Sequence, residues 1–554
     1  MYQIYPRSFH DSNGDGVGDL QGITGHLEYV ADLGVDGVWI SPFFRSPMKD
    51  FGYDVSDYRD IDPLFGTLKD FDHLVEKAHG LDLKIIVDLV MSHTSNTHSW
   101  FQESRLSRNN EKADWYVWAD PSKDGTPPNN WRSVFGGEAW EFDTKRCQYY
   151  LHNFLKEQPD LNFHNPAVQQ EMLEITRFWL EKGVDGFRLD AINFIMHDPE
   201  LRDNPPADMS AIGAATQYEK PDPYSMQQHI YDKSRPEAFG FIEKLRSVMD
   251  EFEGSFALAE IGDMSVSLPM EYTNGPEKLH TAYSFGLMGQ NKLNASKLRE
   301  VVGPYLESDA NCWPSWAFSN HDVVRTASRW ADGVTDENKC GMVKTLIALL
   351  LSLRGTIFIY QGEELGLPDS EIPYDKIQDP WGKYLWPEWQ GRDGCRTPMP
   401  WTNEYPNGGF TRPEVMPWLP VDRNHLDRSV KAQEAKPDSV LNFTRKIINW
   451  RKNCEALTTG DMKLFNTPFE DLVAFERCGN TEQYLCLFNL GENPLEMNEK
   501  EFGYEPGKFS LLGSDHAPQD SGETNSCLSL PDHLPTINQE SVSLLPGSFL
   551  ITRI

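Results

Sequence analysis

The sequence predicts an α/β fold: a (β/α)8 TIM barrel with an inserted subdomain after strand 3, a long loop insertion after strand 8 and a C-terminal β-sandwich. Short, nearly continuous apolar runs alternate with helical patterns along roughly the first 460 residues, which is typical of parallel strands covered by helices. Two long stretches rich in Pro and Trp interrupt this alternation. Towards the C-terminus, alternating strands replace it.

The predicted barrel strands are rich in Val, Ile and aromatic residues, and most end on a polar or charged side chain. They are Tyr2–Tyr5, Val35–Phe44, Leu83–Val90, Val184–Asp190, Phe256–Glu260, Trp316–Asp322 and Thr356–Glu363. Helices are predicted from Thr67, with Asp70 in a capping box, over 168–179 and over about 338–353.

The rhythm of these elements also predicts the domain boundaries. The barrel is expected over 1–93 and 166–464, with 364–420 as its loop-rich insertion. An inserted domain, called domain B, is expected over 94–165, and a C-terminal β domain over 465–554. Within the last of these, strands are predicted at Leu472–Cys478, Gln483–Leu490, Lys508–Leu512 and Ser541–Ile554.

The charge balance excludes several classes of partner. Asp and Glu number 84 against 51 Lys and Arg, a net charge of −33, which repels nucleic acid and anionic membranes and favours a neutral small-molecule substrate. No apolar run is long enough to span a membrane and no secretion signal is present, so we expect a cytoplasmic protein; the oligomeric state is left open. Motifs for phosphate cradles, Ser-His-Asp acyl transfer and zinc hydrolysis are missing from the sequence, and no organic cofactor is expected.

Carboxylates close several of the predicted strands. Because a barrel brings the C-terminal ends of its strands to one mouth, Asp88, Asp190, Glu260 and Asp322 are expected to converge. Arg188, on the same side of the pleat as Asp190, favours an ionised Asp190, while the apolar strand before Glu260 favours its protonated form. Such a pair suits a retaining glycosidase, in which one carboxylate attacks the sugar and the other protonates the leaving oxygen. A buried Arg–Asp pair that only braces the barrel is the alternative.

Four segments in barrel order make the prediction specific: Asp88–His93, Gly186–Asp190, Glu260 at its strand end and Phe318–Asp322. With them, the chain resembles the α-amylase family of glycoside hydrolases (family 13). Two further segments, Gln158–Phe163 and Gly391–Trp401, resemble the α-glucosidase and oligo-1,6-glucosidase branch of that family. The resemblance covers essentially the whole chain.

The resemblance implies roles for individual residues. Asp190 would be the nucleophile, Glu260 the acid and then base, and Asp322 the stabiliser of the transition state. The residues implied to bind the sugar are Arg188, His93 and His321, which hold the first glucose unit, Tyr53, which stacks on its face, Asp54, which binds hydroxyls with Arg392, and Phe135 and Phe154, which line the pocket.

The implied activity is that of a retaining, exo-acting α-glucosidase that releases glucose from the non-reducing end of short α-glucosides resembling maltose, sucrose or isomaltose, with transglucosylation as a side activity. The alternatives are a sucrose isomerase, trehalulose synthase or dedicated glucosyltransferase on the same scaffold, and a non-catalytic barrel like the heavy subunits of amino acid transporters. Two departures stand out: Ser92 replaces the usual Asn, and Ala191 replaces the Val or Thr that goes with α-1,6 or α-1,4 preference, so the linkage is left open.

Oxygen donors alternate near the start of the chain, around Gly16, as in the first nine positions of an EF-hand loop. The resemblance implies a structural Ca²⁺ or Mg²⁺ ion there. Its ligands would be Asp11, Asn13, Asp15, the carbonyl of Val17, and Asp19. Position twelve is Gly22 where an EF-hand has Glu, and an Asx-rich turn without metal is the alternative.

Overall fold

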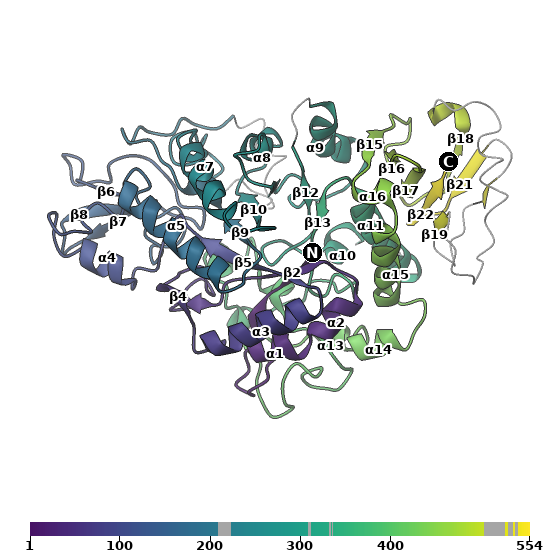
Figure 1. The fold of residues 1–554 in the computed structure, drawn as a ribbon, viewed down its shortest axis with the longest axis horizontal. Coiled ribbons are helices and arrows are strands. Elements are labelled where there is room, and N and C mark those ends of the chain that lie inside the picture. Colours follow the sequence, from purple (N-terminus) through teal and green to yellow (C-terminus); the bar gives the residue numbers. More distant parts are fainter. Residues whose placement is uncertain are drawn as a thin grey trace.

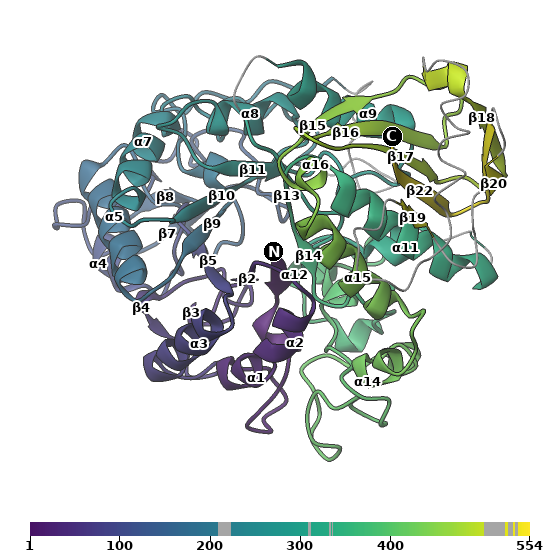
Figure 2. The same cartoon turned by 45° about the vertical axis from the view of Figure 1, so that its right-hand side comes forward.

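Parallel strands form a closed barrel at the centre of the molecule. The computed structural model describes residues 1–208, 223–308, 312–331, 334, 336–502, 527–529, 536–537 and 541–554. The barrel strands are β1 (Tyr2–Ile4), β2 (Gly37–Ile40), β5 (Lys84–Val90), β9 (Gly186–Asp190), β10 (Phe256–Ile261), β11 (Thr281–Ser284), β12 (Ser315–Trp316), β13 (Thr356–Ile357) and β14 (Ile359–Tyr360). They pair in the order β11-β10-β9-β5-β2-β1-β14, and β12 closes the ring by pairing with β13 and, through a bridge between Ala282 and Pro314, with the β11 side. The predicted barrel is confirmed (Figure 2).

The C-terminal half of the barrel differs in detail from the prediction. Strand β11 was not predicted at all. The predicted strand Trp316–Asp322 ends at Trp316, and Asp322 lies in the turn beyond it. The side chain of Asn320 accepts a hydrogen bond from the backbone N–H of Asp322 at 2.8 Å, which stabilises this turn instead of an extended strand.

Helices surround the barrel (Figure 1). They are α1 (Leu20–Gly25), α2 (Leu27–Asp32), α3 (Leu68–Gly80), α5 (Pro166–Glu181), α7 (Ala238–Met249), α8 (Ser267–Thr273), α9 (Ala295–Glu307), α10 (Thr326–Trp330), α11 (Asp336–Ser352), α12 (Pro380–Leu385), α13 (Arg423–Leu426), α14 (Val430–Glu434), α15 (Val440–Lys452) and α16 (Glu455–Thr458). The three predicted helices correspond to α3, α5 and α11. Helix α3 begins with the predicted capping box between Thr67 and Asp70.

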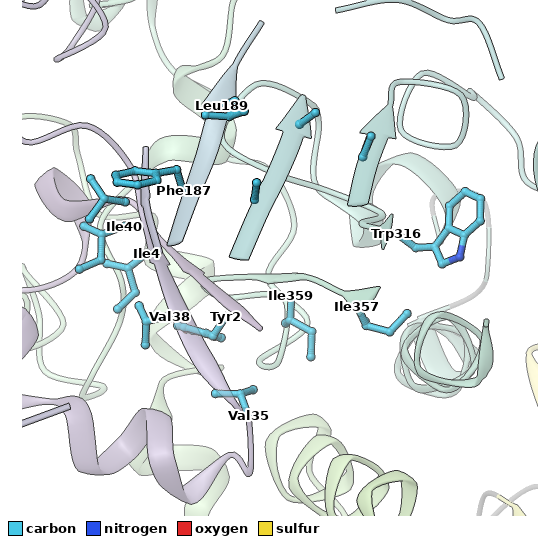
Figure 3. Packing of buried hydrophobic residues seen from close by; sticks show 14 of the residues in the cluster. Tyr2, Ile4, Val35, Val38, Ile40, Phe187, Leu189, Trp316, Ile357 and Ile359 are labelled. Carbon is cyan, nitrogen blue, oxygen red and sulfur yellow. The ribbon is translucent and has the colours of Figure 1, made fainter. Parts of the chain in front are cut away.

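Alternate residues of each barrel strand enter different cores. Val38 and Ile40 of β2 and Phe187 and Leu189 of β9 belong to the large cluster that packs against the helices (Figure 3). Trp39, between the first two, belongs to a separate cluster with Ile86 and Leu258. Because side chains alternate along a strand, this second set fills the barrel interior.

Two regions add strands to the barrel. Between β5 and α5 lie α4 (Ser99–Ser104) and an antiparallel sheet ordered β6-β8-β7, formed by β6 (Trp118–Ala119), β7 (Trp140–Asp143) and β8 (Gln148–Leu151). After α16, two antiparallel sheets follow. They contain β15 (Asp461–Leu464), β16 (Leu472–Cys478), β17 (Gln483–Asn489), β18 (Leu495–Asn498), β19 (Cys527–Ser529), β20 (Thr536–Ile537), β21 (Ser541–Leu544) and β22 (Ser548–Arg553).

An apolar cluster joins the two C-terminal sheets, with Leu485 of the larger sheet and Met497 of the smaller among its members. The predicted strand Ser541–Ile554 is divided at Gly547, whose φ of 61° is a turn conformation. The predicted strand 508–512 lies outside the described residues. The domain boundaries given above stay predictions. None of the helices described here is long and apolar enough to cross a membrane.

Candidate active site

Strand alternation places four charged side chains inside the barrel. Asp88, Arg188 and Glu260 each lie two residues beyond an inward-facing position, and Asp190 follows Arg188 at the same spacing. The Arg188 guanidinium contacts all three carboxylates: Asp88 at 2.8 Å, Glu260 at 2.5 Å, and Asp190. Asp190 and Glu260 therefore lie next to the same guanidinium.

The charges of this cluster are nearly all removed from water. Burial raises the pKa of Asp190 to about 7 and that of Glu260 to about 7, although Arg188 favours both ionised forms. The predicted rise for Glu260 is therefore found. Arg188 favours an ionised Asp190, as expected, but burial and the nearby Asp88 outweigh it, and the same guanidinium also contacts Asp88 and Glu260.

Backbone and side-chain donors hold the Glu260 carboxylate. The N–H of Ala191, a residue in the left-handed region with φ 39° and ψ 44°, donates to Oε2 at 3.0 Å. The hydroxyl of Tyr283 donates to Oε1 at 3.2 Å and accepts from Arg188 at 3.3 Å. Tyr283 lies on the unpredicted strand β11, and sequence reasoning missed it.

Asp322 has two cationic partners of its own, different from the Arg188 that the other carboxylates share. Arg392 contacts its Oδ1 at 3.0 Å and Arg396 contacts the same oxygen at 2.8 Å. Burial opposes ionisation, but His321, Arg392 and Arg396 together hold the pKa of Asp322 well below its usual range. Its side chain is 21% exposed, against 10% for Asp190 and 6% for Glu260, so the cluster is open on the Asp322 side.

Tyr53 and His321 form one stacked pair, with ring centroids 5.4 Å apart and an interplanar angle of 1°. Gln3 Nε2 donates to Nδ1 of His321 at 2.8 Å, so Nε2 carries the proton and lies 2.6 Å from the Tyr53 hydroxyl. That hydroxyl in turn donates to Asp88 at 3.1 Å. Tyr53 is thus held by hydrogen bonds beside Asp88 and Arg188 in the barrel.

His93 lies beside Tyr53. Its Nε2 donates to the carbonyl of Tyr53 at 3.1 Å, and the hydroxyl of Ser92 lies 3.0 Å from its Nδ1. The departure at Ser92 therefore leaves His93 with a local hydrogen bond. The ring of Phe154 lies 5.2 Å from His93.

The resemblance implies that Asp54 and Arg392 bind sugar hydroxyls together, and this role stays a prediction. Asp54 accepts hydrogen bonds from Ser46, Lys49 and Asp50 within its own loop, at 2.8 to 3.0 Å, and has no contact with Arg392. Asp50 contacts Arg392 instead, at 3.0 Å. The hydroxyl-binding carboxylate expected at Asp54 is therefore better sought at Asp50, four residues earlier in the same loop.

Arg392 is fixed on several sides. Asp379 accepts from its Nε at 3.1 Å and from its Nη2 at 2.8 Å. Its guanidinium lies 5.0 Å above the ring of Phe135, which also stacks on Trp381 at 5.1 Å and lies 5.7 Å from Phe154. Phe135, Phe154 and Arg392 thus lie close together, and their binding of a sugar stays a prediction.

The predicted metal loop is ordered by its own hydrogen bonds. Asp11 Oδ1 accepts from Gly14 N–H at 2.6 Å, and Asp11 Oδ2 accepts from Gly16 N–H at 2.8 Å. Asn13 and Asp15 each accept from the amide two residues on, at 2.9 Å. Asp19 instead accepts hydrogen bonds from the N–H of Ser12 and from the N–H of Gly22 in the first turn of α1.

These oxygen donors and the φ of +94° at Gly16 suit a hard cation in chemistry. However, in the part of the chain that the structure describes, no three His, Cys, Asp or Glu side chains are close enough to one another to hold a metal ion. The carbonyl of Val17 and the amide oxygen of Asn13 would have to complete the set.

With β13 and β14 counted as one interrupted strand, the barrel has eight strands, and three carboxylates surround one arginine at their carboxyl ends. This fold and this site are typical of a glycoside hydrolase. Residues 3–460 match the α-amylase catalytic domain. The chain belongs to the α-amylase family of glycoside hydrolases, in its α-glucosidase and oligo-1,6-glucosidase branch.

Curated relatives of this branch span nearly the whole chain. It is 53% identical over 494 residues to a probable α-glucosidase of Rhizobium meliloti (strain 1021), covering 89% of this chain and 88% of the relative. It is 35% identical over 536 residues to an oligo-1,6-glucosidase of Heyndrickxia coagulans, covering 90% and 93%.

Solved structures extend the comparison to an α-glucosyl transfer enzyme and an isomaltulose synthase. An α-glucosyl transfer enzyme, XgtA, matches with a TM-score of 0.90 and 46% identity, covering 100% of this chain and 98% of the other. A mutant isomaltulose synthase of Erwinia rhapontici NX5, in complex with sucrose, matches with a TM-score of 0.84 and 30% identity, covering 100% and 97%.

Proposed function

We propose that this enzyme is a retaining, exo-acting α-glucosidase that releases glucose from the non-reducing end of short α-glucosides and also transfers the glucosyl group to other alcohols. The observation that carries the proposal is the shared contact of Asp190 and Glu260 with Arg188, because two carboxyl groups at one cavity are what double displacement needs. The relatives named above are consistent with it.

In the first step, Asp190 attacks the anomeric carbon while Glu260 gives its proton to the departing glycosidic oxygen. The raised pKa of Glu260, about 7, keeps that proton available near neutrality. In the second step, the Glu260 carboxylate takes a proton from water or an acceptor alcohol, whose oxygen displaces Asp190 from the sugar. Because each step inverts the configuration at the anomeric carbon, the product keeps the configuration of the substrate.

The remaining residues bind the sugar and match its transition state. Asp322, held anionic by Arg392 and Arg396, suits the positive charge that develops on the ring. Tyr53 offers an aromatic face to the sugar, and His93 and His321 bound the same pocket. Asp50 and Arg392, paired at 3.0 Å, would close its end and so favour removal of a single terminal glucose.

Replacing Asp190 with Ala tests the proposal. We expect loss of both hydrolysis and transfer with p-nitrophenyl α-glucoside, and partial rescue by azide with formation of β-glucosyl azide. The control is Asp72→Asn, at an exposed pair with Lys182, which should retain activity. Substantial turnover by the Asp190 variant without azide would refute the assignment.

Product analysis separates the proposal from its alternative. A sucrose isomerase would return the glucosyl group to fructose, whereas an α-glucosidase gives glucose and fructose from sucrose. Chromatography of the products formed from sucrose distinguishes the two. Isomaltulose or trehalulose as the main product would favour the isomerase.

A structural divalent cation in the loop 11–19 is part of the proposal. Asp11, Asn13, Asp15 and the Val17 carbonyl supply hard oxygen donors, and binding would stabilise the loop, not take part in the chemistry. We expect about one Ca²⁺ or Mg²⁺ per chain by elemental analysis and a fall in Tm on chelation. An unchanged Tm and no bound metal would contradict this.

A further inference from the structure

The two strands that carry Asp190 and Glu260 stop pairing with each other just before these residues. The pairing of β9 with β10 ends where Leu189 lies opposite Ala259. Beyond this point β10 continues beside β11, and Glu260 lies opposite Tyr283. The separation of the two carboxylates therefore depends on contacts made beyond the paired part of β9 and β10.

Asn193 connects the segments that follow the two strands. It lies in the 3-10 helix Ile192–Phe194, three residues after Asp190, and it is fully buried. Its Oδ1 accepts a hydrogen bond from the N–H of Gly262 at 2.9 Å, and Gly262 is the second residue after Glu260. One side chain thus joins the turn after Asp190 to the turn after Glu260.

The remaining groups of Gly262 are held as well. Lys233, in the segment before α7, donates from Nζ to the carbonyl of Gly262 at 2.9 Å and lies 3.3 Å from the carboxylate of Asp263. The Lys233 side chain is only 7% exposed. A Cβ on Gly262 would lie 2.9 Å from the ring of Phe194, so this glycine packs directly against the 3-10 helix. Its N–H, its carbonyl and its Cα are therefore all fixed by neighbouring segments.

Asn193 is itself anchored to the segment that carries Lys233. Its Nδ2 donates to the hydroxyl of Ser234 at 3.0 Å, and its carbonyl accepts from the N–H of Ser234 at 2.6 Å. Because Nδ2 donates to Ser234 and Oδ1 accepts from Gly262, these two partners define the orientation of the amide. The two side chains that hold Gly262 are thus linked to each other through adjacent residues.

We propose that Asn193, together with Lys233, is a positioning residue that sets the place of Glu260 relative to Asp190. The inference rests on the proposed function, because it concerns how the acid reaches the glycosidic oxygen while the nucleophile attacks. Retaining glycosidases need their two carboxyl groups about 5 to 5.5 Å apart, and an acid must lie within hydrogen-bond reach of the oxygen that it protonates.

Loss of these contacts affects the acid more than the nucleophile. Asp190 stays paired with Val90 of β5, whereas Glu260 is followed directly by the turn that Asn193 holds. A leaving group that is stable as an anion, such as p-nitrophenolate, needs little help from the acid, but a sugar leaving from a disaccharide needs a proton. The value of kcat/KM covers the steps up to the glucosyl-enzyme, so it reports on the acid role of Glu260.

A comparison of two substrates tests the proposal. For Asn193→Ala, kcat/KM is measured with p-nitrophenyl α-glucoside and with maltose or isomaltose, whichever the unmodified enzyme cleaves faster. We expect the ratio of the disaccharide value to the aryl glucoside value to fall at least about tenfold, since acid–base catalysis contributes about 10² to 10⁴-fold. This ratio does not depend on how much of the variant is folded.

Two further variants extend the test. Lys233→Met removes the bond to the carbonyl of Gly262, should lower the ratio in the same way, and decides the matter if Asn193→Ala does not fold. Asn193→Asp keeps an oxygen that can accept from the N–H of Gly262, so its ratio should lie nearer to that of the unmodified enzyme.

The matched control is Asn489→Ala in the C-terminal sheet. Asn489 is fully buried on β17, and its Oδ1 accepts from the N–H of Gly491 at 3.0 Å, as that of Asn193 does from Gly262. Its replacement should lower stability and leave the ratio of the two kcat/KM values unchanged.

Equal losses with both substrates in Asn193→Ala and Lys233→Met would overturn the inference. So would an equal fall of the ratio in Asn489→Ala, or a ratio for Asn193→Asp as low as that of Asn193→Ala. Failure of the unmodified enzyme to release glucose from these substrates would instead refute the proposed function, and the inference with it.

Discussion

Glu260 has to lose a proton in one step of the proposed reaction and regain it in the next, so single neighbours decide its behaviour. Arg188, Tyr283 and the N–H of Ala191 all donate to its carboxylate. Each of these bonds favours the ionised form, whereas burial and the nearby Asp190 and Asp322 oppose it. Replacing Tyr283 with Phe removes only the hydroxyl group, so the contribution of this hydrogen bond can be tested by itself.

Tyr283→Phe is expected to raise the pKa of Glu260, because one donor to its ionised form is lost. The basic limb of the pH profile of kcat/KM should therefore shift to higher pH, with kcat reduced several-fold. Tyr272→Phe is the matched control, since the buried Tyr272 hydroxyl has no hydrogen-bond partner among the residues that the structure describes. A basic limb that does not move, or that moves to lower pH, would contradict the positioning role.

The residue scale also shows where sequence reasoning fails. The segment around Tyr53 was correctly expected beside the carboxylates, but Asp50, not Asp54, contacts Arg392. Phe51 and Gly52 between them have φ values of 51° and 112°, so the chain turns and strand alternation no longer predicts which side chain faces inward. The conformation of this turn decides which carboxylate contacts Arg392.

At the scale of elements, the alternation of side chains along the strands predicts most of the site residues. Asp88, Asp190 and Glu260 could be predicted together because β5, β9 and β10 are long enough to show their pattern and to fix which face is inside. Strand β11 has four residues and β12 two, too few to establish a period, and there Tyr283 was missed and Asp322 was placed on a strand it does not belong to.

Gly186 offers a test of how closely β9 and β10 must approach. A Cβ at this position would lie 2.0 Å from the carbonyl oxygen of Phe256, so Gly186→Ala must push apart the strands that carry Asp190 and Glu260. We expect a lower Tm and at least about a tenfold loss of kcat. Gly240→Ala in helix α7, where a Cβ meets nothing within 4 Å, should stabilise slightly and retain activity. Wild-type kcat in the Gly186 variant would show that the strand spacing is not critical.

At the scale of the whole molecule, the barrel buries ionisable carboxyl groups, and their ionisation lowers the stability of the fold. Asp190 and Glu260 are both buried, and both have pKa values raised to about 7. A carboxyl group whose pKa is raised by folding binds its proton more tightly in the folded state, so its contribution lowers stability as pH rises from about 4, the unfolded value, to about 7. The site that the fold positions for chemistry is therefore expected to cost stability at neutral pH.

Glu260→Gln isolates this cost, because Gln keeps the shape of the side chain and cannot ionise. Whichever way the amide turns, its NH2 group faces a donor, either the N–H of Ala191 or the groups of Arg188 and Tyr283, a penalty that does not depend on pH. The difference in Tm between the variant and the unmodified enzyme should therefore shift in favour of the variant between pH 5, where Glu260 is protonated in the folded state, and pH 8, where it is charged. Thermal melts at both pH values measure this shift, and Glu111→Gln on the surface supplies the comparison. A Tm difference that stays constant, or that turns against the variant at pH 8, would mean that Arg188 and Tyr283 stabilise the charged form of Glu260 more than burial destabilises it.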